Sequence, residues 1–70
     1  MELDKWIEEG KKDIERGIEQ EIDRIVEFDP DKIFNLMLGL SEAKRRELIT
    51  EEGFKRLSEK LKKKIKEIVG

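Results

Sequence analysis

Two ridges of apolar side chains at helical spacing constrain this chain most strongly. At 100° per residue, one ridge follows residues 3–28 and the other follows residues 54–68. The first consists of Leu3, Ile7, Ile14, Ile18, Ile22 and Ile25, and the second of Phe54, Leu57, Leu61, Ile65 and Ile68. No segment alternates apolar and polar residues over more than four positions, which argues against strands. The sequence therefore predicts an all-α fold in which burial of both ridges provides most of the stability.

The first ridge passes through two glycines, Gly10 and Gly17. Each costs about 1 kcal/mol relative to alanine inside a helix. Because the phase holds across both, we predict one continuous helix over residues 3–28. The glycines then lie on a flank where another helix or a large ring, from Phe34 or Phe54, approaches the backbone.

A second interpretation of the first ridge stays open. Gly10 is then the residue that ends a short first helix, and Asp13 caps the helix that follows. In that case the chain has five helices in place of four.

Capping signals divide the rest of the chain. Asp29 is typical of an N-cap, and Pro30 is typical of the first helical position after it. Gly39-Leu40-Ser41 indicates a helix end, and Thr50 indicates a further N-cap. We predict a single domain over residues 1–70 with helices at 3–28, 30–38, 42–49 and 51–69. The connections of one to three residues favour irregular or orthogonal packing, with two long amphipathic helices enclosing two short ones.

The composition restricts the chemistry of the chain. It lacks cysteine and histidine, which excludes disulfides and removes the commonest general base and metal ligand. Charged residues make up 49% of the chain, but the net charge is only −2. Residues 1–28 carry a net charge of −5 and residues 50–70 a net charge of +3. This asymmetry predicts an acidic first helix beside a basic last helix.

The polar side chains give no pattern typical of an enzyme. Four carboxylates of the first helix point away from its apolar ridge: Glu8, Glu9, Glu15 and Glu19. Glu21 lies on the ridge, and we interpret it as an edge residue paired with a lysine of the last helix, the alternative being a buried acid. Ser41 and Ser58 lack a base partner. We therefore predict no enzymatic activity and no catalytic, cofactor-binding or metal-binding residues.

Binding to nucleic acid or to membranes is also not predicted. Residues 42–60 could be drawn as a helix-turn-helix with Lys44, Arg45 and Arg46, but Glu51 and Glu52 would repel phosphates at the start of its second helix. The run Lys60–Lys66 is interpreted as a solvated face beside the acidic first helix. The N-terminal residues do not resemble a signal peptide, and no apolar run is long enough to span a bilayer. We expect a soluble chain, and no cellular location is indicated.

The segment Ile33–Leu40 is the most apolar part of the sequence. We expect a monomer that needs no partner. A homodimer through Ile33–Leu40 stays open, because this segment carries more apolar surface than a chain of 70 residues readily covers.

The segments FDPDK, LGLSEAK and KLKKKIKEIVG resemble those of computationally designed all-α miniproteins. Such proteins combine helix caps, minimal loops, Glu/Lys surfaces and a single tryptophan, here Trp6. The resemblance implies a thermostable chain with no evolved biochemical function, whose purpose is the fold itself. The alternative is a small natural helical module for protein–protein interaction. Helix-interior glycines at positions 10, 17 and 53 depart from the designed style, and Glu/Lys enrichment is also typical of thermophile proteins.

Overall fold

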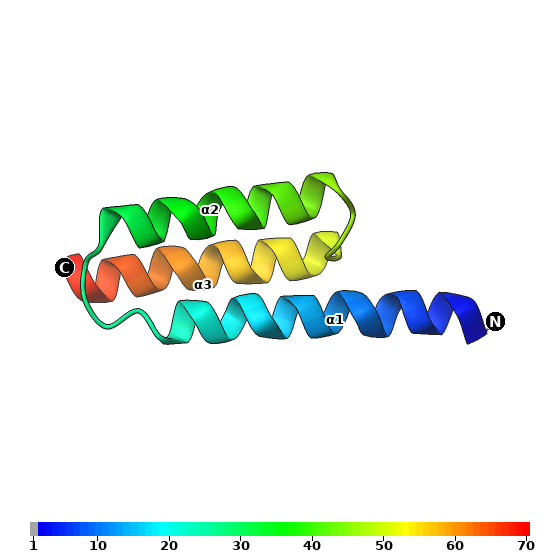
Figure 1. Cartoon of the computed structure of the whole chain (residues 1–70). Coiled ribbons are helices and arrows are strands. Elements are labelled where there is room, and N and C mark those ends of the chain that lie inside the picture. Colours follow the sequence, from blue (N-terminus) through cyan, green and yellow to red (C-terminus); the bar gives the residue numbers. More distant parts are fainter. Residues whose placement is uncertain (1) are drawn as a thin grey trace.

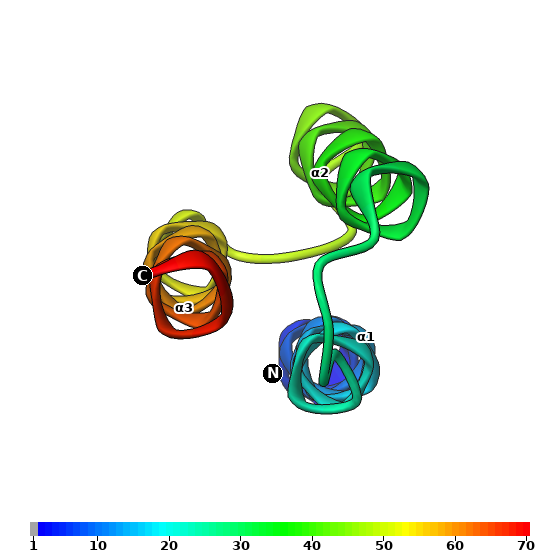
Figure 2. The same cartoon turned by 90° about the vertical axis from the view of Figure 1, so that its left-hand side faces the viewer.

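A computed structural model describes residues 2–70, with side chains from Lys5 onward. It contains three α-helices: α1 (Glu2–Asp23), α2 (Pro30–Arg45) and α3 (Glu51–Val69). They lie side by side, with α1 and α3 running in one direction and α2 in the other (Figure 1). Seen end-on, they occupy the corners of a triangle (Figure 2). The result is an elongated three-helix arrangement that measures 46 × 17 × 16 Å.

The all-α class is confirmed, but the prediction of four or five helices in an irregular or orthogonal arrangement is wrong. The predicted helices 30–38 and 42–49 are replaced by α2, which runs straight through Gly39-Leu40-Ser41, and no described glycine has a positive φ. One face of α2, formed by Ile33, Leu36, Leu40 and Ala43, packs on the core. This helical spacing continues across the glycine and outweighs its cost of about 1 kcal/mol. The residues after Arg45 form the turn to α3.

The first helix is continuous through Gly10 and Gly17, as predicted, so the alternative break at Gly10 is wrong. It ends at Asp23, however, and not at residue 28. The chain must reverse direction between α1 and α2, and residues 24–29 make that connection. Ile25 still fills the core from this irregular segment. Because isoleucine and valine are only moderate helix formers, the segment leaves the helix at low cost.

The predicted starts of the other two helices are confirmed. The Asp29 side chain accepts a hydrogen bond from the Lys32 N–H at 3.3 Å, and Pro30 follows it in the first turn of α2. Thr50 caps α3, whose bounds are those predicted for residues 51–69. These starts were predictable because each depends on a local pattern of two or three residues.

The core lies between the three helices and consists of Ile22, Ile25, Ile33, Leu40, Ala43, Ile49, Leu57 and Leu61. The second apolar ridge is buried or half-buried along its length, as predicted. The expectation that the whole first ridge is buried is wrong: Ile7 is 52% exposed and Ile14 is 39% exposed. Leu3 lies outside the described side chains.

The N-terminal part of α1 extends beyond the other two helices (Figure 1). Every described side chain from Lys5 to Gly10 is exposed, and Lys11 is the first that is half-buried. We call residues 2–10 the overhang. At 1.5 Å per residue its length is about 13 Å.

The expectation that Phe34 or Phe54 packs against the glycines of the first helix is wrong. A Cβ atom added at Gly10 or Gly17 would have no described neighbour within 4 Å, apart from the helix's own backbone. Phe34 is 60% exposed, and Phe54 lies on the core with the Lys44 ammonium 4.5 Å from its ring centre. Within one chain, both glycines therefore face open space.

The turn after α2 contains a strained residue. The N–H of Glu47 donates to the Lys44 carbonyl at 3.0 Å, and the N–H of Leu48 donates to the Ala43 carbonyl at 2.8 Å. This is the hydrogen-bond pattern of a Schellman motif, which places Glu47 at the position where glycine is usual. Its φ is 58°, in the left-handed region, which costs a non-glycine residue about 1–2 kcal/mol.

We expect Glu47→Gly to raise the free energy of unfolding by about 1 kcal/mol, because glycine adopts the left-handed conformation without a Cβ clash. Urea unfolding followed by circular dichroism measures the change. Arg46→Gly is the control, since Arg46 has φ −86°. Glycine there adds flexibility to the unfolded chain and removes the ion pair with Glu42, so it should not stabilise the protein. Stabilisation by both substitutions, or by neither, would contradict this explanation.

Candidate functional site

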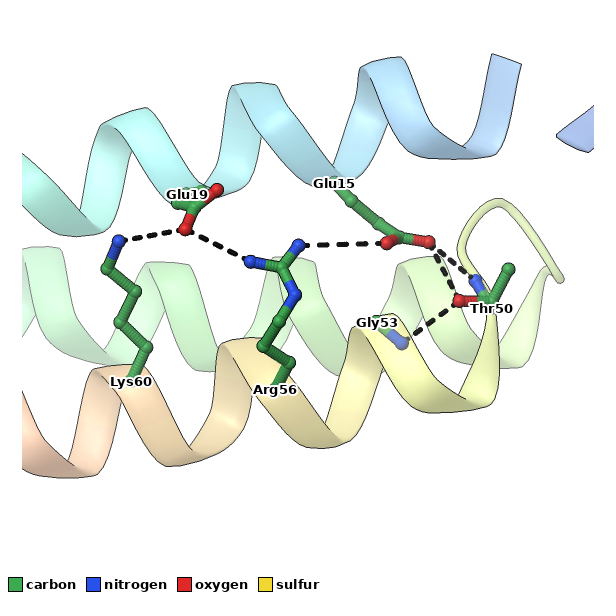
Figure 3. A network of polar contacts seen from close by, with 6 residues as sticks. All are labelled: Glu15, Glu19, Thr50, Gly53, Arg56 and Lys60. Carbon is green, nitrogen blue, oxygen red and sulfur yellow. Dashed lines mark hydrogen bonds and ion pairs between the residues drawn. The ribbon is translucent and has the colours of Figure 1, made fainter. Parts of the chain in front are cut away.

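A buried carboxylate joins α1 to the start of α3. Glu15 is only 6% exposed, and its Oε2 accepts hydrogen bonds from the N–H and the Oγ1 of Thr50 at 3.0 and 2.9 Å (Figure 3). The Thr50 Oγ1 in turn accepts from the Gly53 N–H at 2.9 Å. The carboxylate thus lies at the positive end of the α3 dipole, where a negative charge is favourable.

These contacts form a capping box to which both α1 and α3 contribute a side chain. In the usual capping box, a Glu or Gln at the third helical position accepts a hydrogen bond from the N-cap N–H. In α3 that position is occupied by Gly53, which has no side chain to do so. Glu15 of α1 supplies the missing carboxylate, so the capping of α3 depends on a residue 35 positions earlier in the chain.

Gly53 also makes room for this carboxylate. A Cβ atom added at Gly53 would collide with the carboxyl group of Glu15. Of the two glycines that fall inside α2 and α3, Gly39 and Gly53, only Gly53 is buried. A side chain at Gly53 would therefore displace the Glu15 carboxyl group from its hydrogen bonds with Thr50. A Cβ added at Gly39 would have no described neighbour within 4 Å outside its own helix.

Alanine substitutions at these two glycines should have opposite effects. We expect Gly53→Ala to lower the free energy of unfolding by about 1–2 kcal/mol, because displacing Glu15 breaks buried hydrogen bonds to a charged group and the better helix propensity offsets only part of this loss. Gly39→Ala is the matched control and should raise it by about 1 kcal/mol. Chemical denaturation of both variants gives the comparison. A gain in stability at Gly53 equal to that at Gly39 would show that Glu15 does not occupy this position.

A ladder of ion pairs continues from Glu15 along α1 and α3. The Arg56 guanidinium lies 3.8 Å from Glu15 and 3.0 Å from Glu19. The Lys60 ammonium lies 2.9 Å from Glu19 and 3.0 Å from Asp23 (Figure 3 shows the pair with Glu19). The predicted pairing of an acidic first helix with a basic last helix is thus present, with residues four positions apart on each side.

The ladder changes the acidity of its members. The hydrogen bond from Lys60, with the nearby charge of Arg56, lowers the pKa of Glu19. Hydrogen bonds to Glu19 and then to Asp23 raise the pKa of Lys60. The contribution of Glu19 to stability is therefore present above the ordinary pKa of a glutamate and is lost as the pH falls through its lowered pKa. The contribution of Lys60 to stability is present below the ordinary pKa of a lysine and is lost as the pH rises through its raised pKa.

Removing the lysine charge should restore ordinary titration of its partner. We expect Lys60→Gln to raise the pKa of Glu19 toward the usual glutamate value, because the main group that favours its charged form is gone. Carboxyl chemical shifts in an NMR titration measure this. Lys62→Gln removes the same charge from an exposed position and should leave Glu19 unchanged. Glu42, whose pKa is lowered by Arg45 and Arg46, is an internal reference. An unaltered Glu19 titration in Lys60→Gln would contradict the ion pair.

The geometry of this network is that of a structural element. Glu15 is held by Thr50 and Arg56, and no buried side-chain nitrogen or oxygen among the described residues lacks a hydrogen-bond partner. Within the same residues, no group of three or more acidic or other metal-ligating side chains comes together. The network holds α1 against α3 and sets their register.

The sequence predicts no site residues, and the predicted positions of three glutamates are wrong. Glu19 is half-buried and pairs with Arg56 and Lys60 of α3. Glu15 does not point away from the apolar ridge but is buried against α3. Glu21 is exposed and pairs with Arg24 at 2.9 Å, and not with a lysine of the last helix. One signal for Glu15 was available: Thr50 is followed at the third helical position by glycine, so its N–H needs a carboxylate from elsewhere.

The basic residues of the helix-turn-helix interpretation, which the sequence does not favour, contact other residues of the chain. Arg45 and Arg46 both donate to Glu42 Oε1, at 2.6 and 2.8 Å, and Lys44 lies over the ring of Phe54. The segment does not form the predicted short helix, since these residues lie at the end of α2.

A groove between α1 and α2 is the second candidate site. Ile14 and Ile18 line it from α1, and Leu36, Gly39 and Leu40 line it from α2. The polar residues around it are Glu21, Arg24, Lys32 and Asn35. Unlike the α1–α3 side, this side of α1 carries apolar residues that remain partly open to solvent.

Among helices of the described residues, none is long and apolar enough to cross a membrane.

Comparison of the chain with protein-family models, with curated proteins and with solved structures finds no match.

Proposed function

We propose that the protein is a helix-binding interaction module, and that the groove between α1 and α2, extended by the overhang, accepts an amphipathic helix. The observation that carries this proposal is the exposure of Ile7 and Ile14 on the same ridge that supplies Ile22 to the core. These side chains have the spacing of core residues, but the described residues leave 52% of Ile7 and 39% of Ile14 exposed. We call Ile7, Ile14, Ile18 and Leu36 the groove face.

The groove face has the length and spacing that helix recognition requires. On α1 it extends from Ile7 to Ile18, a distance of about 16 Å at 1.5 Å per residue, or three helical turns. A bound helix would place residues at positions i, i+3, i+4 and i+7 into it. The charged residues at its end, Arg24 and Lys32 among them, would contact the polar edge of that helix.

The exposed glycines support the same interpretation. Gly10 and Gly17 lie four residues before and three residues after Ile14, and therefore on the same side of α1. Gly39 lines the groove from α2. No side chain from Lys5 onward comes within 4 Å of a Cβ atom added at any of the three, so that a second helix can approach the backbone closely at each.

A designed protein without an evolved activity is the second candidate. Its support is the capping of α2 and α3 by Asp29 and Thr50, which follows the rules that designers use. Two features argue against an idealised design. Glu47 has a positive φ, and Trp6 is 76% exposed beside Ile7, whereas design avoids both strain and exposed apolar patches.

A neutral amphipathic peptide tests the interaction module. We expect a 17-residue helix of leucine, alanine and glutamine, with leucine on one face, to bind and to shift Trp6 fluorescence to shorter wavelength. Ile14→Glu should weaken this binding roughly tenfold or more, because it places a charge in the groove. Phe34→Glu is the control, since Phe34 is also apolar and is more exposed than Ile14, at 60% against 39%, but does not line the groove. Equal loss in both variants, or no fluorescence change at millimolar peptide, would count against the proposal.

A further inference from the structure

We propose that the helix which occupies the groove is α1 of a second copy of this chain, so that each overhang lies in the groove of the other copy. This inference rests on the proposed function and names its partner. The two α1 helices run antiparallel about a two-fold axis, which makes the contact the same on both copies.

The exposed surface of one copy has the size that such a dimer needs. A compact monomer of 8.3 kDa has an accessible surface of about 4,600 Å², whereas this chain exposes 5815 Å². The excess is about 1,200 Å², and a stable interface buries about 800 Å² on each partner. The radius of gyration, 13.0 Å, also exceeds the value of about 11 Å for a compact domain of this length.

The arrangement of large and small residues on α1 fits an antiparallel pair. An axis at the level of Lys12 places Ile7 opposite Gly17 of the partner subunit. The same axis places Gly10 opposite Ile14 of the partner subunit. Each exposed isoleucine then meets a glycine that nothing else covers. This explains why the chain keeps two helix-weakening residues seven positions apart on an exposed face.

Charge also favours the antiparallel arrangement. The overhang, residues 2–10, contains four acidic residues and one lysine and has a net charge of −3. In the antiparallel pair its start reaches the level of Ile22 of the partner subunit, next to the groove end. That end carries two basic residues, Arg24 and Lys32, against one acidic residue, Glu21. In a parallel pair, the two acidic overhangs would lie against each other, which is unfavourable.

The other candidate interface is weaker. In Ile33–Leu40, the two end residues are already buried in the core of their own chain. The exposed apolar residues of this segment are Phe34, Met37 and Leu38. Phe34 and Leu38 are separated from Leu40 by 120° and 160° around α2, on the side away from Gly39 and Lys32. They do not line the groove, and they have no overhang beside them.

Sedimentation and Trp6 fluorescence together test the dimer. Between about 1 µM and about 1 mM, we expect the mass to change from that of a monomer to that of a dimer, with a parallel shift of Trp6 emission to shorter wavelength. Ile7→Glu should raise the dissociation constant roughly tenfold or more. Gly17→Leu should do the same while strengthening the α1 helix, because leucine fills the space opposite Ile7 and is a better helix former than glycine.

Phe34→Glu is the matched control and should leave the dimer intact. A dimer that is dissociated by Phe34→Glu but not by Ile7→Glu would overturn the proposal. A chain that stays monomeric at 1 mM would also overturn it, and if this monomer still binds the leucine-alanine-glutamine peptide, the helix-binding function stands without the homodimer. If the monomer binds no peptide either, both proposals are wrong.

Discussion

The hydrogen bonds between Glu15 and Thr50 determine how the rest of the molecule is placed. A buried carboxylate is stable only where its oxygens are satisfied, and here that place is the first turn of α3. A shift of α1 by one turn in one direction would place Lys11 against the positive end of α3. A shift in the other direction would put Asp23 in the place of Glu19, between Arg56 and Lys60. Because α1 ends at Asp23, Lys60 would then lose the second carboxylate that it now has. The register of α1 against α3 is therefore fixed by charge as well as by packing.

This register explains why so much apolar surface is exposed. With Glu15 level with the start of α3, the preceding residues of α1 have little of α3 beside them, and the overhang has lost its neighbours altogether (Figure 1). The isoleucine ridge nevertheless continues into it. Ile22 is in the core, Ile18 is half-buried, and Ile7 is exposed. The apolar ridge of α1 therefore contributes both to the core and to the exposed surface. The contact between Glu15 and Thr50 determines where along α1 the exposed part begins.

What the sequence predicted correctly depends on short-range patterns. The starts of α2 and α3 follow from Asp29 with Pro30 and from Thr50, and the continuity of α1 follows from its period. The helix end predicted at Gly39 is wrong because the glycine was given more weight than the helical spacing of the apolar residues on either side of it. Glu47 could not have been predicted, because a glutamate at positive φ has no signature in the sequence. The burial of Glu15 depends on a helix 35 residues away, although Gly53 at the third position of α3 was a hint.

The glycines inside the helices lower the stability of the chain, and their positions relate to the proposed binding of a second helix. Gly10, Gly17 and Gly39 together cost about 3 kcal/mol relative to alanine, a large part of the 5–15 kcal/mol by which domains are usually stable. Gly53 has an explanation within the chain, since it accommodates Glu15. The other three have none among the described residues. Gly39 lines the groove between α1 and α2, and Gly10 and Gly17 lie on the side of α1 that carries Ile14. Departures from local preference tend to gather where a protein functions. A second helix in the groove would give these three positions the same explanation that Glu15 gives Gly53: a close neighbour that leaves no room for a side chain.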